Sequence, residues 1–275
     1  MQKKIAVIND LSGYGRCSLT VAIPVLSAMG HQCCPVPTAI LSNHTEFPVY
    51  FFDDYTEKMT PYTDKWKELG LSFDAIATGF LGSEAQIEIV MDIIQKLDAE
   101  KTFVVVDPVM GDHGHAYETY TPEMCEQMKE LVCMADVVLP NVTECCILTD
   151  TPYKEENWTR KELLNMAMML RLMGAKSVVI TGVREGSCYT NVVLEQGQYD
   201  AKFIRTKSSG GERPGTGDVF SSVVAGALLN GKSLPEAVSQ AAGFVKECIK
   251  VSDEEQIPHA NGVCFEKILG KLIKK

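Results

Sequence analysis

The chain has 275 residues, of which 45% are hydrophobic and 23% charged, and its formal net charge is −10. This length is enough for one large α/β domain or two small ones with a sizeable core, and the composition is that of an ordinary globular protein. The acidic balance, without any basic cluster, argues against a general nucleic-acid-binding protein. No run reaches the roughly 18 apolar residues of a membrane-spanning helix, and the first residues do not resemble a signal peptide. We therefore expect a cytoplasmic protein.

The ten cysteines do not follow a metal-binding pattern. None of their spacings is Cys-x-x-Cys, and the adjacent pairs at 33/34 and 145/146 do not make a zinc framework. The histidines likewise show no His-x-x-x-His spacing. Without a secretion signal, we interpret the cysteines as reduced thiols used as small apolar residues.

In the N-terminal half, short apolar runs alternate with helical patterns. The expected strands are 3–9, 31–37, 74–78 and 102–107. The expected helices are 18–29, 61–70 and 84–97. Ser83 and Gln86 have the spacing of a capping box at the start of the third helix. The aromatic stretch 47–52 is expected to be a short strand or a flap.

The C-terminal half continues the alternation. The expected strands are 136–139 and 177–181, and a hairpin is expected to pair 187–194 with 198–206. Helices are expected at 159–173, 219–230 and 233–250, and two more are expected to begin at 122 and at 262. Thr159 and Glu162 form another predicted capping box. The polar, glycine-rich segment 207–213 is expected to be mobile.

Each polar cluster of the chain follows a predicted strand. The clusters are 10–16, 42–45, 107–112, 141–144 and 181–182. In parallel sheets covered by helices, ligands bind outside the carboxyl ends of the strands. We therefore expect one domain, 1–275, built as a three-layer α/β/α sandwich with a mainly parallel central sheet, and we expect the clusters to converge on one edge.

Several clusters also have a purely structural interpretation. Residues 42–45 suit ligand contacts, but they also suit a capped polar loop. Asp107 and Asp112 suit a hydrated Mg²⁺ or a substrate ring nitrogen, whereas loop aspartates often only form turns. Asn141 and Glu144, three residues apart at a helix start, fit a shared ligand and a capping box equally well.

The sequence Gly215-Thr216-Gly217-Asp218 precedes an almost uncharged helical run. The glycines let backbone amides approach a ligand oxygen, and a helix start suits an anion that develops during a reaction. Asp218 is well placed to act as a general base. The pattern differs from a P-loop, because no Gly-Lys-Ser/Thr follows. The competing interpretation is a glycine turn with Asp218 as the helix cap.

Taken together, the motifs occur in the order seen in pyridoxal kinases. They are Ser42-Asn-His-Thr45, Thr78-Gly-Phe-Leu-Gly82, Asp107-Pro-Val-Met-Gly-Asp112, Pro140-Asn-Val-Thr-Glu144 and Gly215-Thr-Gly-Asp218. Over nearly its whole length the chain resembles this family of the ribokinase-like superfamily, and most of all the bacterial enzymes often called pyridoxamine kinase. Gly-x-Gly-Asp alone indicates only the superfamily, whereas the first and third motifs together are much more specific.

The resemblance implies a reaction. The γ-phosphoryl group of ATP would pass to the 5′-hydroxyl of a B6 vitamer, namely pyridoxal, pyridoxine or pyridoxamine. By this resemblance Asp218 would take the hydroxyl proton, and the amides of Gly215, Thr216 and Gly217 would hold the charge of the transferring phosphate. Thr216 would also contact ATP.

The resemblance further implies the residues around ATP. Asp107 and Asp112 would lie near the phosphates and Mg²⁺, with Asn141 and Glu144 completing this shell. The two aspartates and Glu144 would hold the metal through water, and Thr181 would contact the nucleotide. A monovalent cation such as K⁺ often assists in this family, and its members are commonly homodimers.

On the vitamin side, the resemblance implies contacts from Asp10, Tyr14, Thr45 and Phe80, while 207–213 would lie over the nucleotide. Two of these residues depart from the family pattern. Asp10 replaces a common serine, and Phe80 replaces a common tyrosine. We hypothesise that Asp10 favours a cationic substrate or a protonated ring nitrogen.

Three alternatives stay open at this point. A hydroxymethylpyrimidine kinase would use the same anion hole, although residues 42–45 favour pyridoxal. A dinucleotide-dependent oxidoreductase would use Gly13 and Gly15, but Ser18 occupies the place of the third glycine, and 215–218 would have no role. A non-catalytic vitamer-binding protein would not need the complete motif at 215–218.

Overall fold

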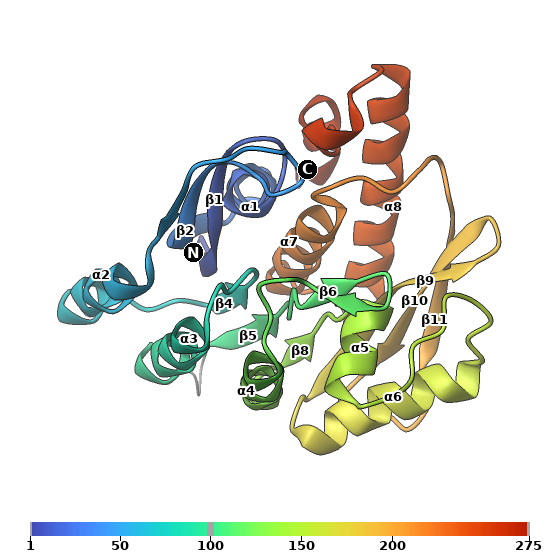
Figure 1. The fold of residues 1–275 in the computed structure, drawn as a ribbon, viewed down its shortest axis with the longest axis horizontal. Coiled ribbons are helices and arrows are strands. Elements are labelled where there is room, and N and C mark those ends of the chain that lie inside the picture. Colours follow the sequence, from blue (N-terminus) through green and yellow to red (C-terminus); the bar gives the residue numbers. More distant parts are fainter. Residues whose placement is uncertain (1, 98–101, 274–275) are drawn as a thin grey trace.

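The computed structural model describes residues 2–97 and 102–273 and is built around a nine-stranded sheet (Figure 1). In sheet order the strands are β11 (Lys202–Lys207), β10 (Cys188–Leu194), β9 (Ser177–Glu185), β8 (Val137–Val138), β5 (Phe103–Val106), β4 (Ala75–Thr78), β1 (Lys4–Tyr14), β2 (Gln32–Asn43) and β3 (Phe52–Asp54). The six strands from β9 to β2 pair in parallel, and β3, β10 and β11 are antiparallel additions at the two sides.

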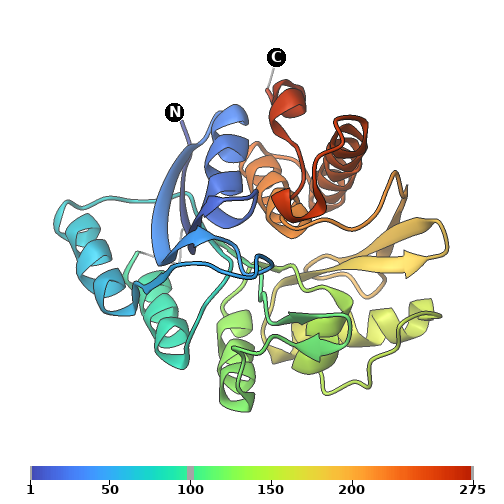
Figure 2. The same ribbon diagram turned by 45° about the horizontal axis from the view of Figure 1, so that its top comes forward.

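Helices cover both faces of this sheet, as Figures 1 and 2 show from two directions. One face carries α2 (Thr56–Glu68), α3 (Glu84–Lys96), α4 (Pro122–Cys133), α5 (Val142–Leu148) and α6 (Arg160–Met173), and the other carries α1 (Ser18–Ala28), α7 (Thr216–Leu229) and α8 (Leu234–Glu254). Successive strand residues serve opposite faces, so Ile76 and Val104 join one core while Ala75 and Val105 join the other. The predicted three-layer α/β/α sandwich is confirmed.

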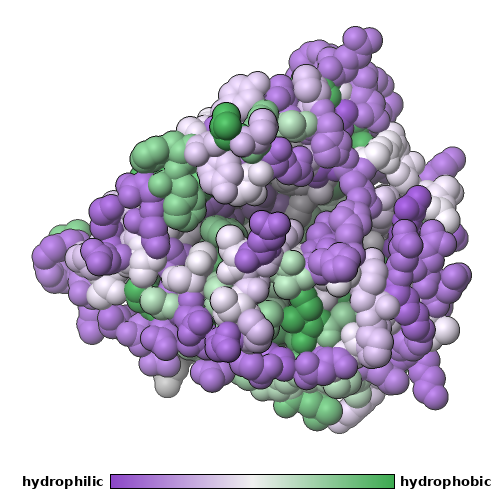
Figure 3. Space-filling view, viewed as in Figure 1, coloured by the Kyte–Doolittle hydropathy of each residue, from purple (hydrophilic) through white to green (hydrophobic). Residues whose placement is uncertain are grey.

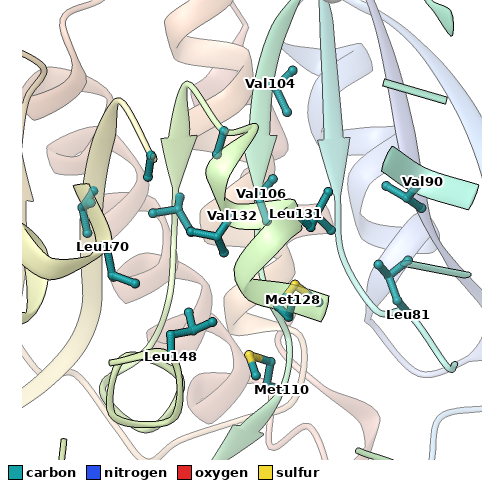
Figure 4. Packing of buried hydrophobic residues seen from close by; sticks show 14 of the residues in the cluster. Leu81, Val90, Val104, Val106, Met110, Met128, Leu131, Val132, Leu148 and Leu170 are labelled. Atoms are coloured by element: carbon teal, nitrogen blue, oxygen red, sulfur yellow. The ribbon is translucent and has the colours of Figure 1, made fainter. Parts of the chain in front are cut away.

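The core also anchors the loop that follows β5. Met110 is fully buried in the same cluster as Met128 of α4 and Leu148 of α5, and these side chains lie close to the carboxyl end of β5 (Figure 4). Beyond Met110 the chain forms a small hairpin from β6 (Gly111–Asp112) and β7 (His115–Ala116). Because Met110 is fixed in the core, Asp107 and Asp112 on either side of it are held at this edge of the sheet.

Some predicted boundaries are wrong. β1 and β2 do not end before the polar residues but stay paired as far as Tyr14 and Asn43, with a register shift between Asn9 and Leu11. Much of the expected loop at 10–16 is therefore strand. In place of the final helix expected from Gly262, the chain forms a 3₁₀ segment, η2 (Glu266–Leu272), and another 3₁₀ turn, η1 (His259–Asn261), precedes it. Apolar patterns mark buried strands, and they do not detect backbone pairing that continues through polar residues.

The helix caps largely agree with the sequence. Ser83 caps α3 by accepting a hydrogen bond from the Gln86 amide, although the Gln86 side chain accepts from Gly82 instead of closing the box. The predicted box of Thr159 and Glu162 is confirmed at the start of α6. Within residues 2–97 and 102–273, none of the helices has both the length and the apolar character needed to cross a bilayer.

Candidate active site

The polar clusters meet at the carboxyl edge of the parallel strands. Backbone hydrogen bonds join the strand ends there: the Asp107 amide donates to the Thr78 oxygen at 3.3 Å, and the Thr181 amide donates to the Pro140 oxygen at 2.8 Å. The face of the molecule seen in Figure 1 is largely hydrophilic and is hollowed near its middle (Figure 3). The expected convergence of the clusters on one edge is thus present in the structure.

Helix α7 begins at this edge with Gly215 as its N-terminal cap residue. Gly215 has φ 77°, and a Cβ there would lie 1.8 Å from the Arg16 carbonyl oxygen, so only glycine fits. No side chain caps the helix, and Asp218 lies inside its first turn. The alternative interpretation of Asp218 as the cap is therefore wrong, and the first-turn amides of α7 are not used by a capping side chain.

Asp218 is half-buried and lies beside Asn9, in the interior of β1. The Asn9 Nδ2 atom donates to Asp218 Oδ1 at 3.3 Å. Burial raises the pKa of Asp218 to about 6, and hydrogen bonds from the Ser18 backbone and from Asn9 limit this rise, while the charge of Asp10 adds to it. A carboxylate with a pKa near neutrality is suited to accept a proton at physiological pH.

Two further carboxyl groups lie close together next to Asp218. Burial raises the pKa of Asp107 well above its usual range, and the charges of Glu144 and Asp218 add to this. Burial also raises the pKa of Glu144, with a contribution from Asp112. Among residues 2–97 and 102–273, no three His, Cys, Asp or Glu side chains group as a direct metal cage. Crowded carboxylates of this kind favour a bound cation.

The open question about Asn141 and Glu144 is answered in part by their hydrogen bonds. They form a capping box at the start of α5, in which Glu144 Oε2 accepts from the Asn141 amide at 2.7 Å. Glu144 Oε1 accepts from the Met110 amide at 3.0 Å, and Asn141 Nδ2 donates to the Gly111 oxygen at 2.8 Å. These bonds fix the loop after β5. A backbone hydrogen bond from Gly111 also reaches Glu144. A carboxylate has about four lone-pair sites, so Glu144 retains one for a ligand.

The other two predicted ATP-side residues lie near this box. Thr181 is half-buried within β9, and its backbone pairs with that of Asn141 in a single parallel β-bridge. Asp112 is exposed on the β6–β7 hairpin, where its Oδ1 accepts from the His113 amide at 2.8 Å. The structure brings Asp107, Asn141 and Glu144 close together, with Thr181 beside them and Asp112 further toward solvent.

Asp10 is held inside the protein by hydroxyl groups. It is only 6% exposed, and its carboxyl oxygens accept hydrogen bonds from Ser12, at 2.8 Å, and from Ser18. Burial raises the pKa of Asp10, whereas these hydroxyl donors lower it. Ser18 adopts φ 53°, which places it in the left-handed region. Asp10 therefore fixes the turn between β1 and α1 and lies close to Asp218.

The remaining vitamin-side residues are spread along the strand ends. Phe80 is half-buried after β4, and its amide donates to Asn9 Oδ1 at 2.9 Å. Tyr14 is 55% exposed and packs edge-on against Phe47, with ring centroids 5.6 Å apart. Thr45 is exposed beyond the end of β2. Phe80 is thus joined to the surroundings of Asp218, while Tyr14 and Thr45 lie at the outer rim.

Segment 207–213 is attached along its length: the Ser208 amide donates to the Ser187 oxygen at 2.9 Å, and the Ser209 hydroxyl donates to the Lys246 oxygen at 2.7 Å. Arg213 donates to the Ile257 oxygen and to Asp253 Oδ1, both at 2.9 Å. Glu212 lies 3.4 Å from the imidazole of His113 on the β6–β7 hairpin. These contacts bring the segment and the hairpin together beside the start of α7.

Sequence reasoning missed Asn9, although it contacts Asp218 directly. Asn9 is 6% exposed and follows the apolar run of β1, so its only signal was an amide at the end of a buried strand. A cavity of about 20 Å³ is lined by Asn9, Thr78 and Asp218. A cavity of about 590 Å³ lies instead at the amino-terminal edge, around Lys3 and Asp74, away from the polar clusters.

A parallel α/β/α sandwich, with a glycine-initiated helix and polar strand ends at one edge, is the architecture expected for a kinase of the ribokinase-like superfamily. Comparison with known proteins leads to the same class. Residues 22–264 match the family model described as phosphomethylpyrimidine kinase, and the chain therefore belongs to this family.

Its relatives include kinases of two related substrates. A hydroxymethylpyrimidine/phosphomethylpyrimidine kinase of Aquifex aeolicus is 33% identical over 174 residues, which are 62% of this chain and 66% of that protein. A pyridoxine/pyridoxal/pyridoxamine kinase of Bordetella avium is 27% identical over 260 residues, which are 89% of this chain and 84% of that protein. A solved structure from Bacteroides thetaiotaomicron, crystallised with pyridoxal, is described as a candidate phosphomethylpyrimidine kinase. It is 40% identical to this chain with a TM-score of 0.93, and the match covers 99% of this chain and 96% of that one. The predicted relationship to pyridoxal kinases is confirmed.

Proposed function

We propose that this protein transfers the γ-phosphoryl group of ATP to the 5′-hydroxyl of pyridoxal, pyridoxine or pyridoxamine. The observation that carries the proposal is the position of Asp218, a carboxyl with a raised pKa in the first turn of a helix whose first amides no side chain caps. A kinase named for all three vitamers aligns with 89% of the chain. The pyridoxal in the crystals of the Bacteroides thetaiotaomicron protein supports the same substrate class.

In this reaction Asp218 takes the proton of the vitamer hydroxyl. As this O–H bond breaks, the hydroxyl oxygen forms a bond to the γ-phosphorus, and the bond from that phosphorus to ADP breaks. The first-turn amides of α7, from Gly215 to Gly217, face the developing negative charge and stabilise it together with the helix dipole. Positioning and electrostatic stabilisation are the main contributions that a protein makes to such a transfer.

On the ATP side, we place the phosphates near Asp107, Asp112, Asn141 and Glu144. Burial raises the pKa of Asp107 and of Glu144, and neighbouring carboxylates add to this: Glu144 and Asp218 beside Asp107, and Asp112 beside Glu144. A cation at this point would relieve the repulsion among them. Carboxylates acting through water suit Mg²⁺, which when bound neutralises charge on the phosphates. Thr181 and Thr216 would contact the nucleotide, as the resemblance to pyridoxal kinases implies.

Other parts of the proposal rest on the resemblance. On the vitamin side, Asp10, Tyr14, Thr45 and Phe80 line the pocket, and segment 207–213 lies over the nucleotide. A monovalent cation such as K⁺ assists the reaction. The protein acts as a homodimer in the cytoplasm.

The alternative is a hydroxymethylpyrimidine kinase of thiamine synthesis, favoured by the family description and by the Aquifex aeolicus relative. Both reactions phosphorylate a hydroxymethyl group on a nitrogen heterocycle. The motif Ser42-Asn-His-Thr45 favours the vitamer.

The test is coupled ADP release with Mg-ATP and K⁺, using pyridoxal, pyridoxine, pyridoxamine and hydroxymethylpyrimidine in parallel. We expect turnover of the three vitamers. Turnover of the pyrimidine alone would preserve the mechanism but assign the enzyme to thiamine synthesis. If all four compounds were inert, the proposal would be wrong.

Activity is expected to fall as the pH drops through about 6. Asp218 is a base only when ionised, and burial raises its pKa to about 6. Because the folded state then binds this proton more tightly than the unfolded chain, the contribution of Asp218 to the free energy of unfolding falls as the pH rises from about 4 to about 6. Lowering the pH through about 6 should therefore reduce activity, although protonation of Asp218 at the same pH stabilises the folded state. We would measure kcat/KM from about pH 5 to 8, since this ratio reports the ionisation of the free enzyme, with circular dichroism alongside. A flat profile would contradict the assignment.

Asp10→Ser is expected to change which vitamer is preferred. If Asp10 favours a cationic group, its loss lowers kcat/KM for pyridoxamine by about tenfold relative to pyridoxine, since a hydrogen bond to a charged group is lost. The measurement is kcat/KM for the three vitamers in both proteins. Asp10→Asn serves as the control for the loss of charge alone, and an unchanged ranking in both variants rejects the idea.

A further inference from the structure

The side chain of Asn9 connects three backbone and side-chain groups around the proposed base. Its Oδ1 accepts hydrogen bonds from the Phe80 amide at 2.9 Å and from the Asp10 amide at 3.0 Å. Its Nδ2 donates to Asp218 Oδ1 at 3.3 Å. Asn9 is 6% exposed, so water has little access to compete for these bonds.

These contacts determine which way the amide points. Two N–H donors converge on one end of the Asn9 side chain, so that end must be the oxygen, and the NH₂ group must face Asp218. The assignment follows from the donors alone, because an amide turned over would place its NH₂ against two other N–H groups. The NH₂ group is thus held toward one oxygen of Asp218.

The neighbouring glycine leaves just enough room for this arrangement. A Cβ on Gly79 would lie 2.3 Å from Asn9 Nδ2 and 2.5 Å from its Cγ. The φ of Gly79 does not lie in the left-handed region, so its backbone conformation alone does not require glycine. The side chain that excludes a larger residue at position 79 is Asn9.

We propose that Asn9 is a positioning residue, which holds one oxygen of Asp218 so that the other faces the substrate hydroxyl. This inference rests on the proposed role of Asp218 as the base. A short amide side chain in the interior of β1, next to the register shift after Asn9, is a rigid support, because both of its ends are hydrogen-bonded. The role is distinct from substrate binding, since Asn9 acts through Asp218.

Other titratable groups also face Asp218 from the elements packed around it. Asp10 lies at the register shift within β1, Asp107 follows β5, and Cys17 precedes α1. Burial and the charges of Asp218 and Asp10 raise the pKa of Cys17 to about 12, so this thiol stays neutral. None of these groups supplies a side-chain donor to Asp218 among the hydrogen bonds of the described residues. The Ser18 backbone amide also donates to Asp218, so the side-chain donor there is Asn9.

The test is Asn9→Asp, which keeps the oxygen that accepts from Phe80 and Asp10 but removes the donor to Asp218. We expect kcat to fall roughly 10- to 100-fold, with KM for ATP and vitamer changed by no more than about threefold. Asn230→Asp is the matched control, because the Asn230 amide donates to the Met29 oxygen away from this site. It should keep the wild-type kcat. A purely structural Asn9 would retain its backbone contacts in Asn9→Asp, and a wild-type kcat would therefore overturn the proposal.

A double-mutant cycle separates this inference from the proposed function. In single-turnover measurements on an Asp218→Asn background, Asn9→Asp should cause no further loss, because its effect passes through Asp218. An equal loss on both backgrounds overturns the positioning role while the base assignment stands. Full activity of Asp218→Asn itself would instead overturn the proposed base.

Gly79→Ala provides a second variant that leaves Asn9 unchanged. The added methyl group displaces the Asn9 amide, so we expect a fall in kcat similar to that of Asn9→Asp. Combining Gly79→Ala with Asn9→Ala should be no worse than Asn9→Ala alone, since the smaller side chain removes the clash. A wild-type kcat in Gly79→Ala would contradict the proposal even if Asn9→Asp failed to fold.

Discussion

Asp218→Asn is expected to lower kcat by roughly 100- to 10,000-fold, the range that a positioned general base contributes. The substitution keeps the size of the side chain and its position in the first turn of α7, but an amide does not accept the hydroxyl proton. Substrate binding should change little, because Asp218 contributes mainly when the proton moves. The measurements are kcat by ADP release and the dissociation constants of ATP and vitamer by calorimetry.

The control for this variant is Asp74→Asn at the opposite edge of the sheet. Asp74 pairs with Lys3 at 2.7 Å and does not contact the polar strand ends described above. It should keep the wild-type kcat even if it loses some stability. Near-normal turnover of Asp218→Asn would show that another group removes the proton.

Gly215→Ala is the second substitution with a large expected effect. Its φ of 77° disfavours any side chain, and a Cβ would lie 1.8 Å from the Arg16 oxygen. The start of α7 must therefore move away from the turn that follows β1. We expect a loss of about 1–3 kcal/mol in the free energy of unfolding, and kcat lower by roughly 100-fold or more because the amides facing the phosphate are displaced.

Thermal unfolding and steady-state kinetics measure the two effects separately. Gly243→Ala in α8 is the matched control, since a Cβ there meets nothing within 4 Å. It should unfold at the same or a higher temperature, because alanine favours helix. A normal kcat in Gly215→Ala would mean that the phosphate is not held by the start of α7.

The sequence was most informative where a local physical rule applies. Apolar runs identify β4 and β5 because both of their faces are buried, and the Thr159–Glu162 spacing identifies a helix start because both ends of the capping box lie in one turn. The clusters after the strands then follow from the topology of parallel sheets. These rules suffice to predict the layers and the edge that holds the site.

The features that were missed depend on contacts between distant parts of the chain. The polar ends of β1 and β2 are strand only because each pairs with the other. Whether Asn141 and Glu144 form a capping box is not determined by their spacing, which suits two roles. Asn9 becomes significant only when Asp218 is placed beside it, and no local pattern shows that.

The contact between Asn9 and Asp218 joins residues 209 positions apart, near opposite ends of the chain. β1 is also an interior strand, paired with both β2 and β4, so this contact requires the middle of the sheet to be complete. Contacts of such long range form slowly during folding, because the entropy of closing the loop is lost before they contribute. Regained activity should therefore report the last stage of assembly, and during refolding it should lag behind the recovery of helical circular dichroism.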